Sequence, residues 1–136
     1  GMFGWSYGGY MTSLCMTKGN GTFKMGIAVA PVTTWRYYDT VYTERFMRTP
    51  KENPEGYDEN SPINFADGLQ GKFLLIHGSG DDNVHYQNSM DFVEALVQAN
   101  KQFEMQFYPN KNHGIYGGNT SIHLYTRMTD FILENL

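Results

Sequence analysis

Gly4-Trp5-Ser6-Tyr7-Gly8 is the stretch that decides the fold of this chain. The pattern Gly-x-Ser-x-Gly is typical of a nucleophile elbow, a sharp strand-to-helix turn that holds the serine in a strained conformation with its hydroxyl exposed. We expect Gly4 and Gly8 to be small because strand and helix nearly collide at such a turn. A strand should therefore end just before Ser6, and a helix should begin just after it.

Two continuous apolar runs follow the elbow and predict strands that are buried on both faces. They span residues 25–30 (Met-Gly-Ile-Ala-Val-Ala) and 72–77 (Lys-Phe-Leu-Leu-Ile-His). Neither run alternates between apolar and polar residues, which is typical of central strands in a parallel sheet. Residues 102–109 do alternate, and they predict a half-covered strand at the edge of the sheet.

Segments with helical spacing of apolar residues lie between and after these runs. The helix after the elbow contains Cys15, which we expect to be a small buried residue, and it should end at Gly19-Asn20-Gly21. A second helix is predicted over residues 84–100, with an inner face of Met90, Val93, Leu96 and Val97. The last is predicted over residues 120–136, with an apolar stripe of Ile122, Tyr125, Met128, Phe131 and Ile132.

Residues 32–62 interrupt this alternation. Tyr38 and Tyr42 are four residues apart and would share one face if the segment is helical, with Trp35 close by. Residues 49–62 are rich in Pro, Glu, Asn, Asp and Gly and predict an exposed loop. A short helical turn should follow Ser61, with Pro62 at its first position. Strands alternating with helices predict an α/β fold with a mostly parallel sheet and right-handed crossovers.

Three residues with catalytic chemistry each follow a predicted strand: Ser6, Asp81 and His113. Function gathers at the carboxyl ends of the strands in a parallel sheet, so all three belong on one rim. A serine hydroxyl needs a base to remove its proton, and a histidine base needs a carboxylate to orient it. The chain order Ser, Asp, His is that of α/β-hydrolases. Asp82 is the alternative to Asp81 as the orienting carboxylate. Only one of them can have this role, because two adjacent aspartates cannot both face one imidazole.

Simpler interpretations apply to other residues. His77 ends a buried strand and is more readily a structural residue than a catalytic one. His85 and His123 lie on predicted helices without a second ligand at metal spacing. Aromatic residues at helical spacing, such as Tyr38 and Tyr42, more often belong to a core than to a pocket.

Composition excludes several classes of function. The 136 residues fit one domain with a core of its own. The formal net charge of -4 argues against nucleic acid as a partner, since a phosphate-binding face needs an excess of Lys and Arg. A single cysteine excludes an internal disulfide and a cysteine-based zinc site. No apolar run is long enough to predict a membrane span.

Several separate motifs then carry a resemblance to a known family. They are Gly4-Trp5-Ser6-Tyr7-Gly8-Gly9-Tyr10, Ala28-Val29-Ala30-Pro31-Val32, Tyr37-Tyr38-Asp39, Val41-Tyr42-Thr43-Glu44-Arg45, His77-Gly78, Asp81-Asp82-Asn83-Val84-His85 and His113-Gly114-Ile115. Together they resemble the catalytic domain of the prolyl oligopeptidase family and, more narrowly, its dipeptidyl peptidase IV branch. The resemblance covers essentially the whole chain.

The resemblance implies a role for each matching residue. Ser6 would be the nucleophile, His113 the general base and acid, and Asp81 the orienting carboxylate, because only Asp81 matches the His-Gly-x-x-Asp pattern. The backbone N–H of Tyr7 would be an oxyanion donor, and Asn83 would hydrogen-bond a substrate carbonyl. A small apolar pocket for proline or alanine would be lined by Tyr7, Val32, Trp35, Tyr38, Tyr42 and Val84.

The reaction implied is release of amino-terminal dipeptides from peptide substrates, with no metal or organic cofactor. Members of this family carry further hydrolase strands and a propeller domain upstream, so residues 1–136 are expected to be a partial catalytic domain. We then expect weak or no activity from this piece alone, and a homo-oligomer formed through an unpaired sheet edge. Residence in the periplasm, at the cell surface or outside the cell is implied as well.

Two other classes of function stay open. One is a related serine hydrolase, such as an acylaminoacyl peptidase or an esterase. The other is a non-catalytic binding module in which the triad residues are present but not aligned.

Overall fold

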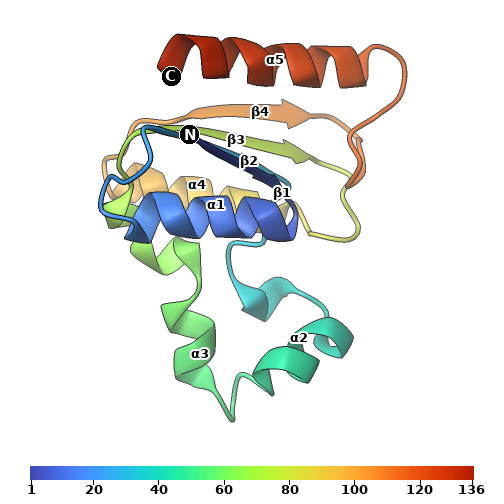
Figure 1. Ribbon diagram of the computed structural model, residues 1–136. Coiled ribbons are helices and arrows are strands. Elements are labelled where there is room, and N and C mark those ends of the chain that lie inside the picture. The colour runs from blue at the N-terminus through green and yellow to red at the C-terminus, as the bar shows by residue number, and fades with distance from the viewer.

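A parallel sheet of four strands in the order β1-β2-β3-β4 organises the chain (Figure 1). The computed structural model describes residues 1–136. Every adjacent pair of strands is parallel, as the common direction of the arrows in Figure 1 shows. The strands are β1 (Met2–Trp5), β2 (Met25–Val29), β3 (Lys72–Gly78) and β4 (Glu104–Tyr108). The predicted α/β fold is therefore confirmed, with β1 and β4 at the two edges.

Helices cover both faces of the sheet (Figure 1). The α-helices are α1 (Tyr7–Lys18), α2 (Thr40–Met47), α3 (Pro54–Glu59), α4 (Gln87–Gln98) and α5 (Thr120–Asn135), and the 3-10 helices are η1 (Trp35–Tyr37) and η2 (Pro62–Gly68). α5 lies on one face, and α1 and α4 lie on the other. Residues 31–71, which we call the helical lobe, project from the side of α1 and α4 and carry η1, α2, α3 and η2.

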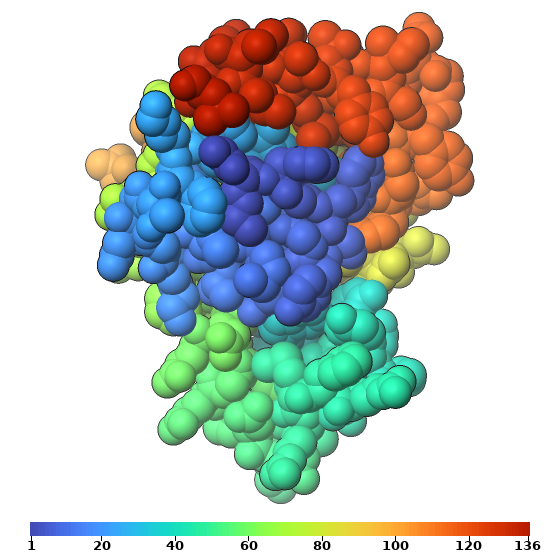
Figure 2. Space-filling model, in the orientation of Figure 1, coloured from blue at the N-terminus to red at the C-terminus, as the bar shows by residue number.

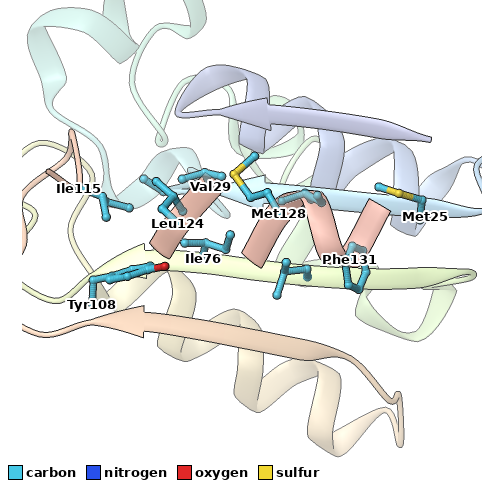
Figure 3. Close-up of a cluster of buried hydrophobic side chains, with 11 residues drawn as sticks. Met25, Val29, Ile76, Tyr108, Ile115, Leu124, Met128 and Phe131 are labelled. Carbon is cyan, nitrogen blue, oxygen red and sulfur yellow. The ribbon is translucent and has the colours of Figure 1, made fainter. Parts of the chain in front are cut away.

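The strand residues alternate between two separate cores, because successive side chains of a strand point to opposite faces. Val29 and Ile76 face α5 and pack with Leu124, Met128 and Phe131 of that helix (Figure 3). The strand residues adjacent to these, such as Ala28 and Leu75, point to the opposite face of the sheet. There they pack under α1 and α4 with Met16, Phe92 and Leu96. Continuous apolar runs are thus explained by a sheet that is covered on both sides.

A third cluster joins the helical lobe to α1 and to the loop after β3. Tyr10 of α1 packs there with Val32, Trp35, Tyr57 and Val84. The prediction of an exposed loop over 49–62 is wrong at Tyr57, which lies on α3 with 1% of its surface exposed. Asn53 caps this short helix, and the Tyr57 hydroxyl donates a hydrogen bond to the carbonyl of Arg48 at 2.6 Å.

The predicted inner face of α4 is only half right. Leu96 is buried, but Met90 and Val97 are 38% and 53% exposed. The helix instead turns Asn88 inward, whose side chain accepts a hydrogen bond from the backbone N–H of Thr33 at 3.0 Å. The buried face of α4 consists of Asn88, Ser89, Phe92 and Leu96. Two of these residues are polar, so the spacing of hydrophobic residues did not predict this face.

The apolar stripe of α5 needs a similar correction. Met128 and Phe131 are buried as expected, and Leu124 joins them one turn earlier. Ile122 and Tyr125 are 71% and 56% exposed instead. Cys15 on α1 is only partly buried, so the expectation of a buried cysteine also fails.

The amino-terminal strand lies at the surface. Figure 2 shows this segment, in dark blue, between α5 in red and the helical lobe in cyan and green. β1 pairs only with β2, so its other side forms an open edge of the sheet within this chain.

Candidate active site

Ser6 lies at the turn between β1 and α1 in a strained backbone conformation, with φ of 58° and ψ of -115°. Positive φ is unfavourable for a residue with a side chain and persists only where the surroundings impose it. The Ser6 N–H donates to the carbonyl of Val29 at 2.8 Å, and its carbonyl accepts from Tyr10 at 2.9 Å. These two backbone bonds hold the turn between the sheet and the helix.

Glycine is sterically required at position 4 and not at position 8. A Cβ on Gly4 would lie 2.1 Å from the carbonyl oxygen of Gly8, whereas a Cβ on Gly8 would meet no atom within 4 Å. The second close approach falls on Gly9, where a Cβ would lie 2.8 Å from the Val29 oxygen. Strand and helix therefore collide at Gly4, as expected, but the expectation for Gly8 was wrong.

His113 lies in the loop after β4 and contacts Asp81, from the loop after β3. The distance from His113 Nδ1 to Asp81 Oδ2 is 2.7 Å, with the aspartate side chain fully buried and the histidine side chain 24% exposed. Because Nδ1 faces a carboxylate, it carries the proton, and Nε2 is left unprotonated in the neutral ring. Asp82 is exposed and makes no hydrogen bond to His113.

The His113 loop is tied to the elbow through Trp5. The indole N–H of Trp5 donates to the backbone carbonyl of His113 at 3.0 Å, across 108 residues of sequence. Trp5 directly precedes Ser6, so this bond places the histidine beside the nucleophile elbow. The Ser6 hydroxyl is not hydrogen-bonded to His113 in this structure, and Nε2 of His113 has no partner.

Asp81 is held by four hydrogen bonds. Its Oδ1 accepts from the backbone N–H groups of Asn83 and Val84, each at 2.9 Å. Its Oδ2 accepts from His113 and from His77, whose Nε2 lies 3.1 Å away. Burial by itself would raise the pKa of Asp81, but the bonds from His113, His77 and the Asn83 N–H outweigh it and hold this pKa well below the usual range. Asp81 is therefore an anion at neutral pH.

The backbone N–H of Tyr7 is available to a ligand. Tyr7 is the first residue of α1, so its N–H has no carbonyl acceptor within the helix. The N–H lies directly after Ser6, where an oxyanion formed on a group attached to the serine oxygen would come to rest.

A small aromatic hollow of about 130 Å³ opens beside Ser6. It is lined by Ser6, Tyr7, Val32, Trp35, Tyr38 and Tyr42. One of the expected pocket residues does not line it, because Val84 is fully buried against Val32 and Trp35. The side chain of Asn83, expected to bind a substrate carbonyl, accepts a hydrogen bond from the Tyr38 hydroxyl at 2.7 Å.

Tyr38 and Tyr42 meet without sharing a helix. Tyr38 is in an extended conformation after η1, and Tyr42 lies on α2, with their rings edge to face at 5.3 Å. The condition for sharing one helical face, a helix that contains both residues, is therefore not met. Trp35 stacks on Tyr42 at 6.0 Å, so the turn between η1 and α2 brings three rings together.

A second, larger hollow of about 340 Å³ adjoins the first and shares Tyr7, Trp35 and Tyr42 with it. Its remaining lining is Tyr10, Thr43, Phe46, Met47 and Asn60. Sequence reasoning missed this hollow, although the four-residue spacing of Tyr42 and Phe46 was a signal for it. The buried hydroxyl of Thr43 has no hydrogen-bond partner.

No group of three His, Cys, Asp or Glu side chains is placed to hold a metal ion. None of the helices combines the length and apolar character needed to cross a membrane.

Comparison with known proteins identifies the family. The sequence profile of the prolyl oligopeptidase family, peptidase S9, matches residues 1–136. The chain belongs to this family. A probable dipeptidyl-aminopeptidase B of Aspergillus oryzae is 49% identical over 98% of the chain, and the prolyl endopeptidase FAP of Mus musculus is 48% identical over 98%. The dipeptidyl peptidase 4 of Porphyromonas gingivalis has the same fold, with a TM-score of 0.97 and 63% identity over 98% of the chain.

The matched region is a small part of each of these relatives. It covers 15% of the Aspergillus protein, 18% of the mouse protein and 19% of the Porphyromonas structure. The family and the α/β-hydrolase fold of this chain are thus shown, while the activity of a whole protein that contains it is a separate question.

Proposed function

We propose that this chain carries the nucleophile, base and orienting carboxylate of a serine exopeptidase that releases amino-terminal dipeptides with proline or alanine at the second position. The observation that carries the proposal is the 2.7 Å hydrogen bond between buried Asp81 and His113, on the same rim of the sheet as the strained Ser6. Membership of a serine peptidase family supports it.

The first step is acyl transfer to Ser6. Nε2 of His113 takes the hydroxyl proton as the serine oxygen bonds to the substrate carbonyl carbon, and the carboxylate of Asp81 stabilises the imidazolium that forms. The Tyr7 N–H donates to the negatively charged carbonyl oxygen. The C–N bond then breaks, and His113 returns the proton to the leaving amine.

Hydrolysis regenerates the enzyme by the same groups in reverse. A water molecule gives its proton to His113 as its oxygen attacks the ester carbon, and the proton passes back to Ser6 when the C–O bond breaks. The dipeptide leaves as a carboxylate. No residue of this chain needs a metal or an organic cofactor for these steps.

The hollow beside Ser6 supports selectivity for a small, rigid residue. Its walls are the rings of Tyr7, Trp35, Tyr38 and Tyr42, which lose little side-chain entropy on binding and exclude water from the reacting carbonyl. Its volume of about 130 Å³ suits a pyrrolidine ring or a methyl group better than a large side chain. The Asn83 side chain, at the rim, is proposed to bind a substrate carbonyl.

We further propose that residues 1–136 alone are weakly active or inert. A second oxyanion donor and a clamp for the free amino group would have to come from other parts of the protein. Loss of one oxyanion donor costs about 2.7 to 4 kcal/mol of transition-state stabilisation. A chromogenic Gly-Pro substrate, assayed on this chain and on the full gene product, tests both proposals. Activity confined to the full product is expected, and full activity in the short chain would contradict the second proposal.

A second candidate function is cleavage after proline within a longer or acylated peptide. It is favoured by the 48% identity to a relative named prolyl endopeptidase FAP. Paired substrates with a free and an acetylated amino terminus separate the two functions. Preference for the free amine supports the exopeptidase, and preference for the acetylated form supports the endopeptidase or an acylaminoacyl peptidase. A pure esterase or a non-catalytic module would cleave neither, and labelling of Ser6 by an organophosphonate would separate those two.

We also propose that the isolated chain self-associates through the open edge of β1, whose unpaired backbone groups can pair with another strand. Light scattering of the 136-residue polypeptide should give a mass above that of the monomer. A monodisperse monomer would contradict this proposal.

A further inference from the structure

His77 contacts the side of Asp81 that faces His113, and the reaction proposed above assigns it no role. It lies near the carboxyl end of β3 with none of its surface exposed. Its Nε2 is 3.1 Å from Asp81 Oδ2 and 2.9 Å from the backbone carbonyl of Val84. Its Nδ1 is 2.6 Å from the hydroxyl of Ser89 on α4, which is also fully buried.

The partners of His77 determine where its proton lies. Both neighbours of Nε2, an ionised carboxylate and a carbonyl, can only accept, so Nε2 carries a proton. The Ser89 hydroxyl has no other hydrogen-bond partner, so it must donate to Nδ1 or leave its own proton unsatisfied in the interior. Every group is satisfied only when His77 is neutral, protonated on Nε2 and unprotonated on Nδ1.

We propose that His77 is a positioning residue for the orienting carboxylate, kept as a neutral Nε2–H donor by Ser89 and Val84. Asp81 Oδ2 then receives hydrogen bonds from two imidazoles of different kinds. The His113 ring becomes a cation when it takes the Ser6 proton, whereas the His77 ring stays neutral throughout. The inference rests on the proposed function, because it assigns a role in that same site.

Neutrality is the useful property of His77. A cation at 3.1 Å would compensate the charge of Asp81 and weaken its attraction for the imidazolium of His113. A neutral donor fixes the carboxylate oxygen without removing that charge. Ser89 therefore acts on Asp81 indirectly. Its hydroxyl donates a hydrogen bond to Nδ1 of His77, which is the nitrogen that would otherwise accept a second proton.

The geometry around His77 is built to hold the ring still. The ring of Tyr86 packs edge to face on it, with 5.8 Å between the ring centroids. Ser89 lies on α4, whose position is fixed by the hydrogen bond from the Thr33 N–H to the side chain of Asn88. The imidazole of His77, on β3, is thus contacted by the segment that joins β3 to α4 and by α4 itself.

The first experiment reads the protonation state without needing activity. Solid-state NMR of the full gene product labelled with ¹³C,¹⁵N-histidine, with His77→Gln used to assign the signals by difference, should give one protonated and one unprotonated ring nitrogen for His77, the proton on Nε2. Two protonated nitrogens, or a proton on Nδ1 alone, would overturn the proposal. A wrong proposal about the reaction would leave this result unchanged.

The second experiment separates positioning from folding. His77→Phe keeps a planar aromatic ring, somewhat larger than imidazole, but removes the donor, and His77→Gln places an amide N–H near the position of Nε2. We expect kcat, per active site titrated with an organophosphonate, to fall about 10- to 100-fold in His77→Phe, as for the loss of a hydrogen bond to a charged group. In His77→Gln most of this loss should be restored, with KM changed less than twofold in both. Equal kcat per titrated site in the wild type and His77→Phe would overturn the proposal, and so would failure of His77→Gln to restore the rate of correctly folded protein.

Discussion

Replacing Asp81 by asparagine tests the site most directly, because the structure dictates how the new amide must lie. Oδ1 of Asp81 accepts from two backbone N–H groups, each at 2.9 Å. The amide oxygen of the variant has to take this position, since an NH₂ group there would face two donors. The NH₂ group is then directed at His113, where Oδ2 lies 2.7 Å from Nδ1 in the native chain.

This orientation reverses the polarity of the contact with His113. The amide donates to Nδ1, so the ring proton moves to Nε2, and the nitrogen that should accept the Ser6 proton is blocked. In a serine protease the same exchange lowers kcat by about 10⁴, equivalent to about 5.4 kcal/mol. We expect a loss of similar size in the full gene product. The Nε2–H of His77 would also face the new NH₂ group, and these two donors facing each other should lower the stability of the folded variant.

The assay is hydrolysis of a chromogenic Gly-Pro substrate, with kcat referred to folded protein. Asp82→Asn is the matched control, because Asp82 is adjacent and exposed and makes no hydrogen bond to His113. Its kcat should remain within about twofold, since an exposed charge has little influence through water. A decrease of less than tenfold in Asp81→Asn would refute the reasoning, as would an equal loss in both variants.

The remaining predictions concern the nucleophile, the elbow and pH. Ser6→Ala in the full gene product should lower kcat by about a millionfold, as for other triad nucleophiles, and should abolish organophosphonate labelling; retention of either would exclude Ser6 as the nucleophile. Gly4→Ala should lower the melting temperature strongly, because its Cβ would lie 2.1 Å from a carbonyl oxygen, whereas Gly8→Ala meets no atom within 4 Å and should leave it unchanged or raised; equal effects would count against the predicted collision. The pKa of Asp81 is lowered on folding, so its contribution to stability is present above the unfolded pKa of about 3.9 and is lost as pH falls through the lower folded value. Urea unfolding should therefore show a free-energy difference between wild type and Asp81→Asn that shrinks from pH 6 to pH 2, and a constant difference would contradict this.

Local patterns were sufficient for the order of the strands and of the helices that cover the sheet. The apolar runs of β2 and β3 and the alternation of β4 are properties of short stretches, because a strand covered on two faces needs apolar residues at every position. The signal for the elbow is equally local, since the close approach of Gly4 to the backbone of Gly8 arises within five residues. The positions of α1, α4 and α5 were also predictable from apolar spacing, to within a few residues at each end, whereas α3 lies in a segment that was predicted to be a loop.

The faces of the helices were less predictable. On α4, the inward position of Asn88 depends on a backbone donor at Thr33, which is 55 residues away in the chain. The burial of Tyr57 likewise depends on the aromatic cluster of the helical lobe and not on its own polar neighbours. Periodicity reports that one face of a helix is apolar, but the neighbouring elements decide which face is covered.

For the candidate site, the sequence by itself determined the residue types, their chain order and their position after successive strands of a parallel sheet. Those features place Ser6, Asp81 and His113 on one rim, because parallel strands end at a common edge. Only the tertiary structure decided which atoms meet. His113 and Asp81 are 32 residues apart in sequence, and His77 reaches Ser89 on a different element. Hydrogen bonds form between atoms within about 3 Å, and the packing of separate elements sets such distances, so the second imidazole on Asp81 became visible only in the folded chain.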